Sequence, residues 1–149
     1  MALQAVVAGV FVQFSESFSM VDLFDTEPGA PVDLMGAVIW PRWLDREAQA
    51  GMLADLRNVA RAAPFRQYET PGGHKMSLHQ DKDEADHHWP VVSISLGDPG
   101  LFRVGGTARK DPTKSRWLMS GDIAVLSGEA RLAYHGIDRI RFGEGDLLP

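Results

Sequence analysis

The sequence predicts a mainly β domain, an antiparallel sandwich or barrel with one helix packed outside it. After residue 65 the chain consists of short apolar runs separated by glycine-containing turns, which is typical of such folds. A single long helical pattern precedes these runs. The chain has 149 residues, of which 44% are hydrophobic, and this suits one globular domain with a buried core.

The first strand and the helix have the clearest boundaries. The apolar run Ala37–Trp40 is stopped by Pro41. Asp45 can cap a helix that runs to about residue 63, where Pro64 ends it. The apolar stripe of this helix is predicted to be a packing face, formed by Met52, Leu56, Val59, Ala60 and Ala63.

The remaining strands are short and alternate in polarity. Val92, Ile94 and Leu96 are predicted to share one face of a strand, with Ser93 and Ser95 on the other. Further strands are predicted at 101–104, 117–119, 123–126 and 132–135, with a polar loop over 107–115. Residues 20–35 mix acidic, proline and glycine residues and are predicted to be irregular, and 136–149 show no periodicity.

Residues 1–20 are predicted to be a leader or an upstream extension, with the single domain comprising residues 21–149. The run 1–14 is apolar, and the first basic residue of the chain is Arg42. A secretory signal needs a positively charged start, and a membrane-spanning helix needs about 20 apolar residues, so neither is favoured. We expect a cytoplasmic protein without a membrane partner, which fits the absence of cysteine.

The charge of the chain argues against nucleic-acid binding unless a local basic patch exists. The formal net charge is -5, so the overall field repels nucleic acid. The segment 103–116 is locally basic and offers contacts to phosphates, although a solvated loop is the simpler interpretation. Its charged residues are Arg103, Arg109, Lys110, Lys114 and Arg116 against Asp111.

A candidate metal site is formed by a His-x-Asp pair and one distant histidine. Because the chain has no cysteine, histidine and carboxylate side chains must supply the ligands. In a strand, His79 and Asp81 face the same way while Gln80 faces the other. His135 follows 54 residues after Asp81, at the predicted end of a strand and beside Gly136. Two histidines and one carboxylate are the ligand set of non-haem Fe(II) oxygenases. The alternative is that His79 and Asp81 only share a hydrogen bond in a polar turn.

The other three histidines are weaker candidates. His87 and His88 are adjacent, so at most one of them can face a site from a strand. They follow several acidic residues and are predicted to lie in an exposed loop. His74 follows Gly73 and is predicted to be exposed as well.

Four ordered stretches carry a family resemblance. They are 78–84 (LHQDKDE), 91–97 (VVSISLG), 121–122 (GD) and 128–137 (GEARLAYHGI), with 64–67 and 70–73 after the helix adding to them. Together they closely resemble the AlkB family of Fe(II)- and 2-oxoglutarate-dependent dioxygenases, which repair alkylated DNA and RNA. The resemblance extends from about Val21 to Ile137.

The resemblance implies a double-stranded β-helix, or jelly-roll, fold whose sheet is incomplete in this chain. It also implies that His79, Asp81 and His135 bind Fe(II), that 2-oxoglutarate is the co-substrate, and that alkylated DNA, or RNA, is the partner. The implied reaction oxidises the N-methyl group of a flipped base such as 1-methyladenine or 3-methylcytosine. The residues implied on the substrate side are Asp83, Arg109 and Arg131.

Two departures from the family pattern lead us to expect weak or no turnover. Only residues 74–77 separate the Thr-Pro-Gly-Gly turn from His79, where the family has a long insert that includes much of its nucleotide-recognition lid. The chain also reaches Pro149 without the family's arginine strand, whose first arginine binds the remote carboxylate of 2-oxoglutarate. Arg139 and Arg141 do not match that motif. The alternatives are a non-catalytic jelly-roll remnant that binds a metal or a partner, and a cupin-like metal enzyme with another reaction.

Overall fold

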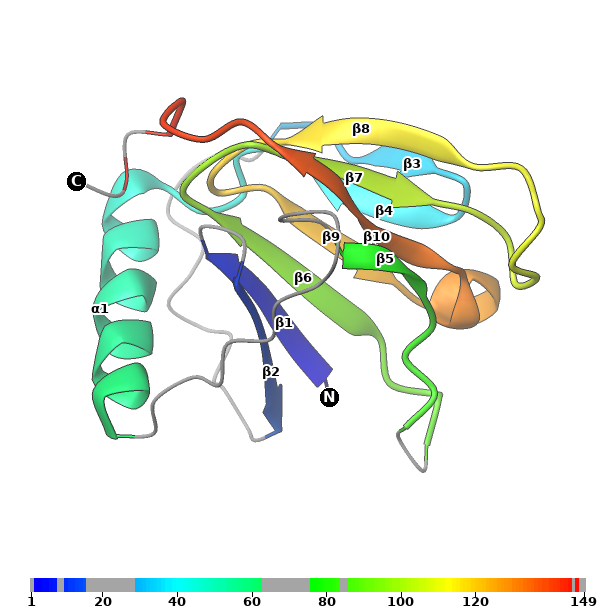
Figure 1. Ribbon diagram of the computed structural model, residues 1–149, viewed down its shortest axis with the longest axis horizontal. Helices are drawn as coiled ribbons and strands as arrows, with labels where there is room; N and C mark the ends of the chain where they lie inside the picture. The colour runs from blue at the N-terminus through cyan, green and yellow to red at the C-terminus, as the bar shows by residue number, and fades with distance from the viewer. Residues whose placement is uncertain are drawn as a thin grey trace.

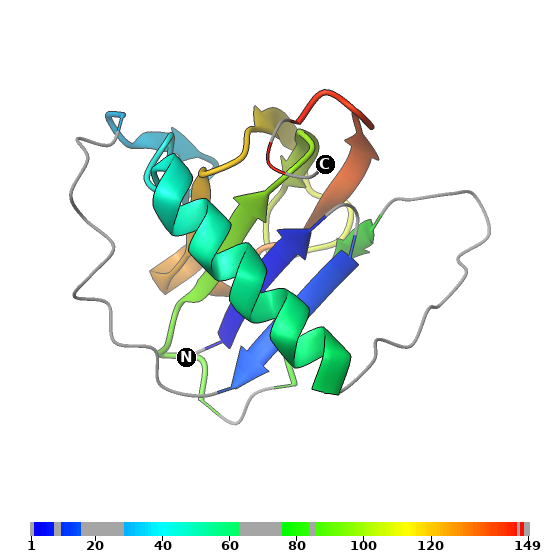
Figure 2. The ribbon, with the colours of Figure 1, turned by 90° about the vertical axis from the view of Figure 1, so that its left-hand side faces the viewer.

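Two β-sheets face one another, and one helix lies across the outer face of the larger sheet (Figures 1 and 2). The computed structural model describes residues 2–7, 10–15, 29–62, 76–83, 86–145 and 147. Neither sheet closes into a barrel within these residues. The predicted mainly β jelly-roll class with an external helix is confirmed.

The larger sheet has six strands and the smaller sheet has four. The order in the larger sheet is β2 (Val10–Ser15), β1 (Ala2–Val7), β6 (Val91–Leu96), β9 (Ile123–Leu126), β4 (Ala37–Trp40) and β3 (Val32–Leu34). The order in the smaller sheet is β5 (Met76–His79), β10 (His135–Ile140), β7 (Gly100–Val104) and β8 (Lys114–Leu118). All pairs are antiparallel except β1 with β6.

Strand β6 separates two hydrophobic layers, because alternate side chains of a strand point to opposite faces. Val92, Ile94 and Leu96 share one face, as the sequence predicts, and this face packs in the layer beneath the helix. Val91 packs in the layer between the two sheets, and Ser93 and Ser95 are buried on that same side. The interior between the sheets is therefore not uniformly apolar, and it can accommodate a polar site.

The helix α1 (Arg46–Ala62) confirms the predicted element but not all of its predicted packing face. Leu56 is buried, whereas the side chain of Val59 is 47% exposed. Gln49, Leu53 and Leu56 are the buried positions, and Met52 packs against the same layer partly buried. Ala63 lies outside the described residues. Gln49 is buried because its amide donates to the carbonyl of Leu44 and accepts from Ser120. The spacing of apolar residues does not predict this buried face, because its first residue, Gln49, is polar.

The capping residue of α1 supports a first test of the fold. The Asp45 carboxylate accepts a hydrogen bond of 2.7 Å from the Ala48 amide, which otherwise has no partner in the first helical turn. We expect Asp45→Ala to lower the free energy of unfolding by about 1 kcal/mol, measured by urea denaturation. Asp55→Ala removes an exposed carboxylate from the middle of the same helix and serves as the control, with a change within about 0.5 kcal/mol. Equal effects of the two substitutions would contradict the capping role.

Three secondary-structure predictions are wrong. Residues 32–34, predicted to be irregular, form β3, which turns into β4 through Met35 and Gly36 with φ of 57° and 86°. Such two-residue turns are usually recognised by Asn-Gly, which is absent here. β8 begins at Lys114 inside the predicted polar loop, because an edge strand tolerates polar side chains. The predicted strand 132–135 is replaced by a 3-10 helix, η2 (Gly128–Leu132), and His135 begins β10 instead of ending a strand.

The N-terminal residues join the larger sheet. Residues 2–7 and 10–15 form an antiparallel hairpin, and β1 pairs in parallel with β6 along its whole length. The division of the chain at residue 20 stays a prediction. Among the described residues no helix has the length and apolar character needed to cross a membrane.

Candidate metal centre

His79 and His135 come from adjacent strands of the smaller sheet. His79 is the last residue of β5 and His135 the first of β10, and the two lie directly opposite each other in the antiparallel pair. Opposite residues project from the same face, so both imidazoles reach the space between the sheets. Their ring centroids are 4.6 Å apart, and His135 is only 2% exposed. Strand pairing thus brings together two residues that are far apart in the sequence.

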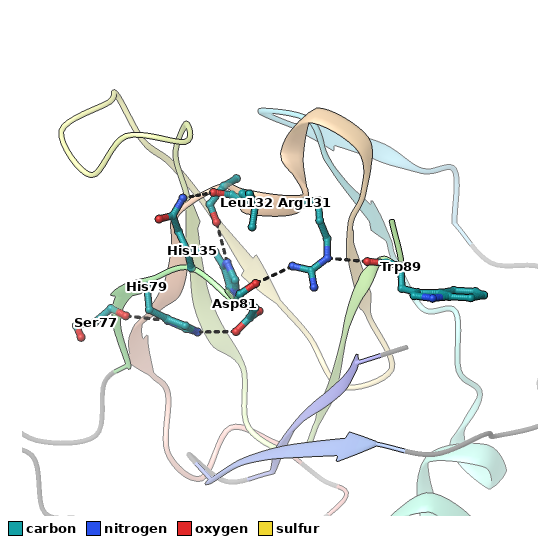
Figure 3. Close-up of polar contacts among 9 residues, drawn as sticks. Ser77, His79, Asp81, Trp89, Arg131, Leu132 and His135 are labelled. Carbon is teal, nitrogen blue, oxygen red and sulfur yellow. Dashed lines mark hydrogen bonds and ion pairs between the residues drawn. The ribbon is translucent and has the colours of Figure 1, made fainter. Parts of the chain in front are cut away.

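Asp81 completes the group from just beyond β5. Its Oδ1 lies 3.6 Å from His79 Nε2, and its Oδ2 lies 3.3 Å from His135 Nε2 (Figure 3). One ligand atom from each of the three residues lies within 4.8 Å of the others. The structure therefore brings together the three predicted ligands, although Asp81 does not belong to the strand that the sequence predicts for it.

The second nitrogen of each imidazole shows which tautomer is present. His79 Nδ1 lies 3.1 Å from the Ser77 carbonyl oxygen, and His135 Nδ1 lies 3.0 Å from that of Ala133. A carbonyl oxygen only accepts, so each Nδ1 carries the proton and donates it. In the neutral form of each ring, Nε2 then presents a lone pair toward Asp81. Burial, together with the neighbouring His135, holds the pKa of His79 below its ordinary value, which favours the neutral imidazole that metals bind.

These lone pairs give a test of whether a cation fits. His135 Nε2 is buried and has no hydrogen-bond partner among the described residues, although Asp81 Oδ2 is 3.3 Å away. Two acceptors facing each other in a buried site repel unless a proton or a cation lies between them. A divalent metal ion would satisfy both imidazoles and the carboxylate at once. A donor set of two nitrogens and one carboxylate is the one that non-haem Fe(II) sites use.

The residues predicted to bind substrate fall into two groups. Asp83 and Arg109 are exposed, and Arg109 Nη1 donates to the carbonyl of Leu78, the residue before His79, at 3.2 Å. Arg131 is only 2% exposed, and it donates to the carbonyls of Asp81 and Trp89 (Figure 3). The structure thus places Arg109 and Arg131 in contact with the segment that carries the metal ligands. The substrate roles of all three stay predictions.

The other predicted candidates do not belong to the group of three ligands. His87 and His88 are exposed, and His88 pairs with Asp86 at 2.7 Å. In the basic segment, Arg103 is paired with Asp138 at 2.5 Å, while Lys110 and Lys114 are exposed. His74 lies outside the described residues.

Two contacts to the site escape sequence reasoning. The centroid of the Phe102 ring lies 6.1 Å from that of the His135 ring, and the two planes are tilted by 45°. Gln80, predicted only to point away from the site, donates to the carbonyls of Thr107 and Leu132. The position of Gln80 between two candidate ligands was the only sequence signal for it.

Comparison with known proteins identifies the class of this chain. The family model of the 2OG-Fe(II) oxygenase superfamily matches residues 68–147, which is more than half of the chain. The chain belongs to this superfamily. Its members use Fe(II) and 2-oxoglutarate. Among the described residues, the group that could hold a metal ion consists of His79, Asp81 and His135.

Within the superfamily the chain is similar to AlkB proteins, as the sequence resemblance implies. It is 60% identical over 77 residues to the alpha-ketoglutarate-dependent dioxygenase AlkB homolog of Caulobacter vibrioides, covering 52% of this chain and 35% of that protein. It is 54% identical over 71 residues to AlkB of Escherichia coli, covering 48% and 33%. It is 44% identical over 72 residues to the DNA N(6)-methyladenine demethylase ALKBH1A of Arabidopsis thaliana, covering 48% and 21%. The chain spans about a third of the length of the two bacterial relatives.

Proposed function

We propose that this chain acts as an Fe(II)- and 2-oxoglutarate-dependent dioxygenase that demethylates N-alkylated bases, such as 1-methyladenine and 3-methylcytosine, in DNA. The observation that carries the proposal is the convergence of two imidazoles and one carboxylate in a chain of this oxygenase superfamily. The names of its relatives support the class of reaction, since they include AlkB dioxygenases and a DNA demethylase.

The protein's own part in this reaction is to bind and to orient. His79, Asp81 and His135 would supply three ligands to the metal and leave its other positions open for 2-oxoglutarate and dioxygen. With iron bound, the site would supply the oxidation of the N-methyl group by dioxygen. One oxygen atom would enter the methyl group, which then leaves as formaldehyde, and the other would enter succinate as 2-oxoglutarate loses CO2. The carbonyls of Ser77 and Ala133 keep the proton on each Nδ1, so that Nε2 stays available as a ligand.

Exposed charges beside the metal site support a nucleic-acid substrate. Asp83 follows Asp81 by two residues and is exposed, so its carboxylate can accept hydrogen bonds from a flipped base. Arg109 is exposed and anchored to Leu78 O, which places a positive charge at the edge of the site. In a chain of net charge -5, such a local cation is what draws a phosphate to this edge.

The proposed function is tested by two measurements on the full chain. Anaerobic titration with Fe(II) and 2-oxoglutarate should produce a metal-to-ligand charge-transfer band. In a separate aerobic assay, formaldehyde should be released only slowly from an oligonucleotide containing 1-methyladenine, because the two departures from the family pattern predict weak turnover. An unmethylated oligonucleotide is the control. Iron binding without the band or formaldehyde would identify a metal-binding jelly-roll without this activity. Absence of iron binding would refute the metal centre itself.

The proposed substrate contact of Arg109 gives a further prediction. We expect Arg109→Ala to raise the KM for a methylated oligonucleotide about tenfold at low salt, with a much smaller change in kcat, because a phosphate contact acts before the chemical step. Arg57→Ala removes an exposed arginine from α1 and is the matched control, with an unchanged KM. The slope of log KM against log salt concentration should fall by about one in Arg109→Ala and stay unchanged in Arg57→Ala. An equal effect of both substitutions would show that Arg109 acts only through the net charge of the chain and makes no local phosphate contact.

A further inference from the structure

The three candidate ligands lie on two short segments whose relative position the sheet defines only in part. His79 and Asp81 lie on one segment, and His135 lies on the other. β5 and β10 pair at His79 with His135 and at Met76 with Ile137, with an irregularity between the two pairs. Asp81 lies beyond the end of β5, so no ladder hydrogen bond of that strand holds it. Some other contact must fix its carboxylate at the two imidazoles.

Arg131 makes the first such contact. Its side chain is 2% exposed, and its Nη1 donates to the Asp81 carbonyl oxygen at 3.0 Å while its Nε donates to that of Trp89 at 2.6 Å (Figure 3). The planar guanidinium offers donors in a fixed geometry, which suits two carbonyls at once. It therefore ties the main chain of Asp81 to η2, the turn that leads to His135.

Gln80 makes the second contact, in the opposite direction. Its Nε2 donates to the Leu132 carbonyl oxygen at 2.5 Å and to that of Thr107 at 3.1 Å. Leu132 ends η2 and precedes His135 by three residues. Each ligand-bearing segment thus donates one side-chain hydrogen bond to the main chain of the other. Gln80, next to Asp81, reaches the segment before His135, and Arg131, four residues before His135, reaches Asp81.

We propose that Gln80 and Arg131 are positioning residues that form a reciprocal clamp and hold the Asp81 carboxylate at His79 and His135 before a metal binds. The clamp rests on the proposed metal centre and deepens it, because it assigns a role to two residues that are not ligands. Groups that orient the ligands of a metal contribute strongly to its affinity. For Arg131 this positioning role stands beside the substrate contact that the family resemblance implies, which stays a prediction.

The clamp is tested by the affinity of the full chain for Co2+, which also reports ligand geometry through its visible absorption. We expect Gln80→Met and Arg131→Met each to weaken Co2+ binding by about 10- to 100-fold in calorimetric titration and to change the Co2+ absorption spectrum. The double substitution should lose much less than the product of the two single losses, because either one already frees the same pair of segments. Arg131→Lys keeps the charge and can reach one carbonyl, so its affinity should be intermediate.

A matched control separates positioning from general stability. Gln49→Met removes another bridging glutamine, one that links α1 to the Leu44 carbonyl and to Ser120, outside the metal centre. We expect it to lower the Tm of the metal-free chain and to leave the Co2+ affinity of the folded chain unchanged. Arg131→Lys provides the measurement on residue 131 if Arg131→Met does not fold.

Three results would overturn the clamp. Co2+ affinities of Gln80→Met and Arg131→Lys within twofold of the unsubstituted chain would show that the ligands need no such support, while leaving the metal centre intact. An equal loss of affinity in Gln49→Met would show that the effect follows stability alone. Failure of the unsubstituted chain to bind Co2+ would refute both the metal centre and the clamp.

Discussion

Replacing His135 with alanine is expected to reduce Fe(II) affinity by more than 100-fold and to abolish any oxidation that depends on the metal. His135 is almost fully buried, its Nδ1 is fixed on the Ala133 carbonyl, and its Nε2 faces Asp81. Its removal leaves only His79 and Asp81 of the triad, so the loss should exceed the 10- to 100-fold typical of residues behind the ligands. Anaerobic calorimetry with Fe(II) measures this loss directly.

The matched control for this substitution is His88→Ala. His88 is also a histidine next to a carboxylate, but it is exposed in a loop and pairs with Asp86. We expect its Fe(II) affinity to match that of the unsubstituted chain. Thermal unfolding of both metal-free variants shows whether each is folded at the titration temperature. Tight Fe(II) binding by folded His135→Ala would show that the metal, if any, lies elsewhere.

Replacing Gly121 with alanine is expected to lower the free energy of unfolding by about 3 kcal/mol, the largest effect on stability that we predict. Gly121 has φ of 89°, which side-chain-bearing residues rarely adopt. A Cβ there would lie 2.5 Å from Gln49 Nε2 and 2.6 Å from the Leu44 carbonyl oxygen. The substitution therefore combines backbone strain of about 1–2 kcal/mol with crowding of about 1–3 kcal/mol.

Gly128→Ala isolates the backbone component of this effect. Gly128 also has positive φ, 54°, but a Cβ there would meet nothing within 4 Å. We expect a loss of about 1 kcal/mol in urea denaturation, clearly smaller than that of Gly121→Ala. Equal losses would show that the helix α1 and the Gly121 turn move apart at little cost.

The parts of the fold that the sequence predicts are those determined by neighbours along the chain. The strand at 123–126 and the helix capped by Asp45 are found where the local pattern places them. β3 has only three residues and a turn without the usual Asn-Gly, so it carries too little local information. The start of β10 at His135 depends on its pairing with β7 and β5, which no local pattern contains.

The candidate site shows the same division. The spacing of His79 and Asp81 is visible in the sequence. His135 is a candidate by residue type and by its place at a predicted strand end, but no local pattern shows that it lies opposite His79. The hydrogen bonds of Gln80 and Arg131 go to carbonyls 27 to 52 residues away. Every residue has a main-chain carbonyl, so the type of the accepting residue does not predict such a contact. These contacts are seen only in the three-dimensional structure.

The place of β5 at one end of the smaller sheet affects how fast a metal ion could be exchanged. Among the described strands β5 pairs only with β10, and it carries His79 at its last position. Outer strands open by local fluctuations at a lower free energy than central ones. A metal ion would therefore leave through transient fraying of β5, and its residence time would follow the hydrogen-exchange rates of the amides in 76–79 and not the global unfolding rate.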